Sequence, residues 1–350
     1  MNTTLDLGYI NGIIKNHKEN SIYGRWIRLS DVEKALSKFK NSSYFSSKII
    51  GSSEESRNIH EVTIGNGSKK ILIWTQMHGN ESTGTKAVID LINYLNKSKD
   101  KIRLQILTNS TIKIIPLLNP DGAEYYTRYN ANSVDLNRDA VNKDATESKS
   151  LRKALDDFKP DFCFNLHDQR TIFGVEGENK PATISFLAPS EESSRKVTNT
   201  RIKTMNVICS MNNLLQETIP GQVGRYSDEF YPTATGDNFQ KLGFPTILIE
   251  SGHFKDDYQR ETVRNFTFMS LLQGIYHISS VKNFNDYQDY FKIPNNVKNF
   301  GDLLHIYPNK ENVGYLYEEI LEENLIKFIP KMIKEDISNL IFHKEIDFVR

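Results

Sequence analysis

The sequence predicts an α/β fold with one main domain, which spans roughly residues 45–285. Two observations lead to this prediction. Apolar runs of strand length alternate along this part of the chain with longer segments of helical periodicity. Several of the runs are apolar at consecutive positions, which is typical of strands that are covered by helices on both faces of the sheet.

The expected elements follow in chain order. A helical leader comes first, in residues 1–44. The runs that predict strands are 59–64, 70–77, 111–118, 161–167, 183–188 and 245–250. Helices are expected over 85–95, 192–217 and 257–280. After residue 285 the runs 312–320 and 325–333 alternate like a hairpin, so we expect 286–350 to form a small β extension.

The composition excludes several partner classes. Lys and Arg number 44, as do Asp and Glu, so net charge gives no reason to expect a nucleic-acid or membrane partner. The first residues lack the basic and apolar regions of a signal peptide, and no apolar run approaches the ~20 residues of a membrane span. We therefore predict a cytoplasmic protein. Cys163 and Cys209 are expected to be buried thiols in a reducing compartment.

The stretch IWTQMHGNESTG, residues 73–84, places a histidine and a glutamate at the end of a predicted strand. Ligands of open α/β sheets bind outside the carboxyl ends of the strands, so His78 should project into such a crevice. Glu81 follows three residues later, where a helix is expected to begin, so both side chains can reach one cation. Imidazole nitrogen and carboxylate oxygen are ligands of hydrolytic zinc sites.

A third ligand is needed for such a site, because catalytic zinc usually takes three protein ligands and leaves one position for water. His167 is the first candidate, since it closes the predicted strand 161–167. His253, in the stretch ESGHF, competes with it. The other histidines have no comparable context and are expected to be structural or solvated.

Two further groups of polar residues stand near predicted strand ends. Arg128, Asn137 and Arg138 belong to a polar stretch that follows the motif NPDG, which we interpret as a tight turn. A guanidinium beside an amide can hold a carboxylate by paired hydrogen bonds. Glu250 ends the strand 245–250 and is either a paired structural charge or a general base whose pKa is raised by desolvation.

Together these motifs resemble the zinc carboxypeptidase family, the peptidases related to pancreatic carboxypeptidase A. HGNE, NPDG, an arginine, DLNRD, a strand ending in histidine and a late strand ending in glutamate follow in the family's order. The resemblance runs from about residue 45 to about residue 280. It implies a mixed eight-stranded sheet between helices, and an enzyme that hydrolyses a peptide bond and releases a C-terminal residue.

The resemblance also assigns roles at the matching positions. It makes His78, Glu81 and His167 the ligands of one Zn²⁺ per chain. Glu250 matches the glutamate that activates the zinc-bound water. Arg128 matches the arginine that polarises the scissile carbonyl and stabilises the oxyanion.

The resemblance further makes Asn137 and Arg138 the pair that holds the terminal carboxylate of the substrate. The family's active-site tyrosine corresponds to either Tyr226 or Tyr231. The sequence departs from the family at Asp139, because the motif reads DLNRDA where DLNRNF is common. This departure introduces a charge beside Arg138.

Other functions stay open at this point. Aspartoacylase and succinylglutamate desuccinylase also carry HGNE and DLNR, so an N-acyl-amino-acid deacylase is an alternative, as is an amidohydrolase of cell-wall peptides. The NPDG motif favours the peptidase. A pseudo-enzyme that only binds peptides is disfavoured by the intact set of His78, Glu81, His167 and Glu250. The expected partner is therefore a peptide or acyl-amino-acid substrate.

Overall fold

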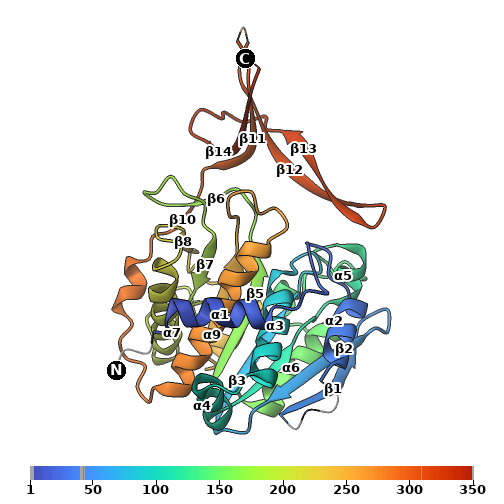
Figure 1. Cartoon of the computed structure of the whole chain (residues 1–350), viewed down its shortest axis with the longest axis vertical. Coiled ribbons are helices and arrows are strands. Elements are labelled where there is room, and N and C mark those ends of the chain that lie inside the picture. Colours follow the sequence, from blue (N-terminus) through green and yellow to red (C-terminus); the bar gives the residue numbers. More distant parts are fainter. Residues whose placement is uncertain (1–3, 40–41, 43, 309, 349–350) are drawn as a thin grey trace.

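The computed structural model describes residues 4–39, 42, 44–308 and 310–348. An eight-stranded mixed sheet crosses the main body in the order β1-β2-β4-β3-β5-β9-β7-β8 (Figure 1). Its strands are β1 Phe45–Ser52, β2 Asn58–Ile64, β3 Lys69–Thr75, β4 Ser110–Ile115, β5 Phe162–Asp168, β7 Ile184–Leu187, β8 Val223–Arg225 and β9 Thr246–Ser251. The predicted α/β class with a large mixed sheet is confirmed.

The central strands β4, β3, β5 and β9 run parallel to one another, so their carboxyl ends lie at the same edge of the sheet. The register pairs His167 of β5 with Glu250 of β9. All six predicted strands are present, with ends that differ by at most a few residues. The strands β1 and β8 were not predicted. β1 is an edge strand with mostly exposed residues, and β8 has only three residues, so neither carries a clear apolar pattern.

Helices cover both faces of the sheet, because alternate strand residues point to opposite sides. Ile71 and Ile73 belong to the core on one face, whereas Leu72 and Trp74 belong to the core on the other. The helices of the first face are α1 Leu7–His17, α2 Leu29–Ser37, α3 Thr83–Lys97, α4 Lys101–Asn109, α7 Asn199–Gln216 and α9 Glu261–Ser280. Those of the second face are α6 Thr146–Phe158 and α8 Thr235–Lys241.

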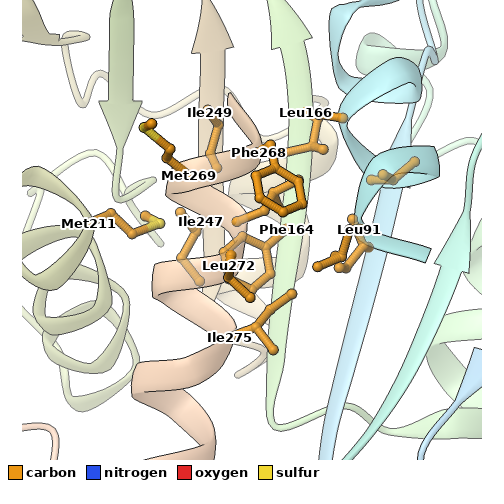
Figure 2. Packing of buried hydrophobic residues seen from close by; sticks show 14 of the residues in the cluster. Leu91, Phe164, Leu166, Met211, Ile247, Ile249, Phe268, Met269, Leu272 and Ile275 are labelled. Atoms are coloured by element: carbon orange, nitrogen blue, oxygen red, sulfur yellow. The ribbon is translucent and has the colours of Figure 1, made fainter. Parts of the chain in front are cut away.

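The centre of the first core lies between the sheet and α9. Figure 2 shows side chains of β5 and β9 packed against those of α9, with Leu91 of α3 and Met211 of α7 at the two sides. The labelled residues of β5, β9 and α9 are Phe164, Leu166, Ile247, Ile249, Phe268, Met269, Leu272 and Ile275. This packing fixes β5 and β9, the two strands that end in His167 and Glu250.

The N-terminal segment is part of this core. Leu5, Ile10 and Ile13 are buried, and α1 packs on α3. The loop after α1 is held by Arg264 of α9. The guanidinium of Arg264 binds the Asp90 carboxylate of α3 at 2.7 Å and donates to the Glu19 carbonyl of this loop at 2.9 Å. Residues 4–28 are therefore held against α3 and α9.

The C-terminal residues form a second sheet that projects from one end of the main body (Figure 1). Its strands, in the order β13-β12-β11-β14, are β11 Phe300–Ile306, β12 Val313–Glu322, β13 Leu325–Met332 and β14 Ile341–Asp347. A short pair, β6 Phe173–Val175 and β10 Asn296–Lys298, lies between this sheet and the main body. The predicted hairpin is confirmed as β12 and β13, joined at Glu323 and Asn324, whose positive φ angles of 52° and 62° suit a two-residue turn. The division of the chain into three parts stays a prediction.

Candidate active site

The connection between β3 and α3 carries the HGNE motif, and it packs closely against the NPDG motif. A side chain at Gly79 would collide with the Gly122 backbone, since a Cβ there would lie 1.9 Å from its carbonyl carbon. The side chain of Asn119 donates to the Met77 carbonyl at 3.1 Å and accepts from the Gly122 amide at 2.8 Å. NPDG was interpreted as a tight turn, but it forms the start of the short helix α5, Pro120–Tyr125, with Asn119 as its N-cap.

His78, Glu81 and His167 meet at the carboxyl edge of the sheet. The Glu81 carboxylate lies 2.8 Å from His78 Nδ1 and 2.9 Å from His167 Nδ1. The two Nδ1 atoms are 3.2 Å apart. These donor atoms all lie within 4.8 Å of one another, and both imidazoles are buried. Two nitrogens and a carboxylate at such separations can bind one ion together, so the donor set fits zinc.

The charges in this cluster follow from the same contacts. Burial opposes ionisation of Glu81, but His78 and His167 outweigh it and hold the pKa of the Glu81 carboxyl well below its usual range. Burial also opposes protonation of His78, but Glu81 and Asp135 raise its pKa. In His167 burial dominates and lowers the pKa.

His253, the competing third ligand, lies elsewhere. Its ring centroid is 4.0 Å from that of His343 and 4.8 Å from that of Tyr258. Burial lowers the pKa of His253 to about 2. Among the described residues, the group of potential ligands found at this edge contains His167 and not His253.

Asp135 was not predicted to have a role, yet it links two candidate residues. One of its carboxylate oxygens lies 3.0 Å from His78 Nε2. The other accepts from Arg128 Nε at 3.1 Å and from Nη2 at 2.9 Å. A metal-binding histidine usually needs a partner for its second ring nitrogen, and the carboxylate of DLNR could have been proposed on that ground. Burial by itself would raise the pKa of Asp135, but the two partners hold it well below its usual range.

Glu250 lies at the end of β9, in register with His167 on β5. Burial raises the pKa of the Glu250 carboxyl well above its usual range, and the charges of Glu81 and Asp168 add to this effect. A carboxyl group whose pKa is raised, beside a cluster of potential metal ligands, is suited to accept and return a proton.

The DLNRD segment continues from Asp135 into a short 3₁₀ turn, η1 Leu136–Arg138. Asn137 Oδ1 accepts from the Thr235 amide at 3.1 Å, whereas the guanidinium of Arg138 is exposed. Asp139 turns away from Arg138. Its carboxylate accepts from the backbone amides of Asp144 and Ala145 just before α6, at 2.9 and 3.0 Å. The departure from the family motif is therefore used to hold the start of a helix.

The two candidate tyrosines face different groups. Tyr226 is half-buried, its ring lies 5.3 Å from that of Phe173, and its pKa is raised by burial and by the charges of Glu250 and Glu81. Tyr231 is 50% exposed, and its ring lies 5.7 Å from the guanidinium of Arg138. Of the two tyrosines, Tyr231 thus contacts a residue of the expected carboxylate grip.

A cavity of about 340 Å³ opens beside Glu81 and Arg128. Its lining includes residues of the N-terminal segment and of the C-terminal hairpin, for which the sequence motifs give no role. Its other lining residues are Arg25, Asn80, Asp168, Gln169, Arg170, Thr171, Tyr258, Arg260, Asp302, Leu316, Tyr317, Glu319 and Phe328.

Among the residues that the structure describes, no helix is both long and apolar enough to cross a bilayer. The cytoplasmic location stays a prediction.

Comparisons with known proteins agree with the motifs. Residues 32–185 match the family model described as zinc carboxypeptidase. A probable carboxypeptidase 2 of Trichophyton verrucosum is 29% identical over 103 residues, 29% of this chain and 20% of that protein. Carboxypeptidase SOL1 of Arabidopsis thaliana is 30% identical over 133 residues, 34% of this chain and 27% of that protein. These matches thus span far less than two thirds of the curated relatives.

Solved structures of the same kind share the fold. A metallo-carboxypeptidase from Burkholderia cenocepacia gives a TM-score of 0.59 at 17% identity, over 72% of this chain and 69% of that one. The carboxypeptidase A of Helicoverpa armigera gives a TM-score of 0.59 at 14% identity, over 79% of this chain and 80% of that one. The resemblance to zinc carboxypeptidases that the motifs predict is confirmed.

Proposed function

From the match of residues 32–185 to the zinc carboxypeptidase family, we propose that this protein is a zinc-dependent metallopeptidase that releases a C-terminal residue from a peptide. The observation that carries the proposal is the convergence of His78, Glu81 and His167, with donor atoms 2.8–3.2 Å apart, at the edge where Glu250 also ends its strand. One zinc ion per chain would be held by these three side chains. When bound, zinc activates water and polarises the substrate carbonyl.

The chain's own residues would carry the proton and the developing charge. Glu250 would take the proton of the attacking water and pass it to the leaving amine, a role that its half-buried position and raised pKa support. Arg128 is 39% exposed and is held by Asp135, so its guanidinium faces the cavity and can donate to the developing oxyanion.

The position of the cleaved bond would be set by Asn137 and Arg138. The exposed guanidinium of Arg138 can pair with the free carboxylate of the substrate, and η1 holds Asn137 beside it. A substrate held by its terminal carboxylate would present its last peptide bond to the proposed zinc site. Tyr231 lies against Arg138 and would border this grip.

A matched pair of peptides, one with a free C-terminal acid and one with an amide, tests the proposal on the zinc-loaded protein. Amidation leaves Arg138 without its charged partner, which should cost about 2–5 kcal/mol, roughly 30-fold to several thousand-fold in kcat/KM. Equal cleavage of acid and amide would contradict a carboxypeptidase and favour an endopeptidase. Hydrolysis of N-acyl amino acids without cleavage of peptides would favour the deacylase.

A further inference from the structure

The hairpin formed by β12 and β13 supplies one wall of the cavity beside the proposed zinc ligands His78, Glu81 and His167. Tyr317 and Glu319 of β12 and Phe328 of β13 line this cavity together with Glu81 and Arg128. In Figure 1 the hairpin extends from the C-terminal sheet across the end of the main body.

Buried polar contacts fix this wall to the main body. Glu319 lies 3.1 Å from Arg25 Nη2 and also accepts from the Tyr126 hydroxyl. The Arg25 side chain is only 6% exposed, so the Glu319 carboxylate offsets part of the cost of burying its charge. Asp302 of β11 accepts from the Tyr258 hydroxyl of the main body at 3.0 Å.

An aromatic cluster reinforces the same wall. The ring of Tyr258 lies 5.2 Å from that of Tyr317 and 5.4 Å from that of Phe328. Such edge-to-face packing is stabilising beyond the area that it buries. The hairpin is therefore a fixed boundary of the cavity, held by ion pairing and by aromatic contacts.

The cavity is lined by Glu81 of the proposed zinc site and by Arg128, the proposed oxyanion partner. Neither Asn137 nor Arg138 is among its lining residues. Under the proposed function, on which this inference rests, the leaving residue occupies the side of Asn137 and Arg138. The part of the substrate that precedes the scissile bond must then enter the cavity and run toward β12.

We propose that the β12–β13 hairpin restricts this enzyme to short peptides, with Tyr317 and Phe328 as specificity-determining residues. The volume of about 340 Å³ is near the lower end of the roughly 300–1,000 Å³ typical of small-molecule pockets. A peptide with one or two residues before the scissile bond fits such a space, whereas a longer chain meets the hairpin. The substrate class is therefore free small peptides, and the C-termini of folded proteins are excluded.

A series of peptides tests this length limit. A dipeptide, a tripeptide, a pentapeptide and an octapeptide share the same C-terminal residues, and kcat/KM is measured for each with the full-length zinc-loaded protein. We expect a fall of at least about tenfold from the tripeptide to the octapeptide, equivalent to about 1.4 kcal/mol. The double variant Tyr317→Ala/Phe328→Ala should reduce this difference to within about threefold, mainly through a lower KM for the octapeptide.

The matched control is Leu325→Ala. Leu325 belongs to the same hairpin, is 64% exposed and does not line the cavity, so this variant should keep the full difference. Phe328→Leu, which better conserves volume, serves as a second variant if the double variant unfolds. Calorimetric binding of the same peptides to Glu250→Gln gives a readout that does not depend on turnover, and it should show the same length limit.

The outcomes separate the two proposals. If the unaltered protein cleaves the octapeptide as fast as the tripeptide, the length limit is wrong and the carboxypeptidase assignment stands. If no peptide is cleaved, the proposed function fails. Binding then decides the length limit, because equal affinity for the tripeptide and the octapeptide, or a length dependence that the double variant leaves unchanged, overturns it.

Discussion

The replacement Asp135→Asn tests how the proposed zinc ligand His78 is held in its orientation. Asp135 contacts His78 Nε2 at 3.0 Å, Arg128 at 2.9 and 3.1 Å, and the Asn137 amide at 2.9 Å. Asparagine has nearly the same shape but only one acceptor oxygen and no charge. If that oxygen faces His78, the amide nitrogen faces the guanidinium of Arg128, and both groups are donors. In the flipped orientation, the same conflict arises at His78 Nε2.

The magnitude follows from losing one charged acceptor. A hydrogen bond to a charged group contributes about 1.5–3 kcal/mol. Partners that orient metal ligands typically change metal affinity by about 10–100-fold, equivalent to about 1.4–2.7 kcal/mol. The two estimates agree, so we expect Asp135→Asn to weaken zinc binding by about 10–100-fold while the fold is retained.

Competition between the protein and a chromophoric chelator measures the zinc affinity, and thermal unfolding of the zinc-free protein measures stability. Asp139→Asn is the control, because Asp139 lies in the same segment but binds backbone amides before α6. It should lower stability by about 0.5–2 kcal/mol, as loss of a helix cap does, and leave zinc affinity unchanged. Unaltered zinc affinity in Asp135→Asn would refute the role of Asp135 in holding His78.

Three further predictions concern turnover and pH. Glu250→Gln should keep zinc and the fold but lower kcat by about 10²–10⁴, and near-normal turnover with zinc bound would remove Glu250 from the mechanism. Arg138→Ala should raise KM for free-acid peptides and shrink their advantage over amides, whereas Arg128→Ala should mainly lower kcat; the reverse pattern would exchange the two roles. Burial lowers the pKa of His277 from 6.5 to about 4, so the unfolded chain binds a proton first as the pH falls. The protein should therefore lose about 2–3 kcal/mol of stability between pH 7 and about 4.5 through this group, and urea unfolding of His277→Gln should show a loss that is smaller by this amount.

The predictable part of the site depends on local patterns. His78, His167 and Glu250 each follow or end an apolar run, and parallel strands bring their carboxyl ends to one edge, so position in a run made them candidates for one site, and the order of the family's motifs grouped them. The position of Glu81 follows from its spacing of three residues from His78 in the connection between β3 and α3. These residues could be found because each lies next to the element that positions it.

The rest depends on contacts between distant segments. Arg25 and Glu319 pair across almost the whole chain, and neither belongs to a motif. Asp139 was interpreted as a charge that acts on Arg138, but the backbone amides before α6 take its carboxylate. No periodicity or spacing reports such pairings, because the packing of separate elements decides them.

The same contacts imply that the C-terminal sheet cannot be removed as an independent unit. Truncation before β11 would remove Glu319 from Arg25 and Asp302 from Tyr258, and would expose the cavity side of the main body. Loss of a hydrogen bond to a charged group costs about 1.5–3 kcal/mol, a sizeable part of the 5–15 kcal/mol that stabilises a typical domain. A chain that ends near residue 299 should therefore unfold at a markedly lower urea concentration than the full-length protein. An unchanged midpoint would show that the hairpin is held too weakly to act as a fixed wall. For this reason point variants within the hairpin, and not truncation, separate substrate length from stability.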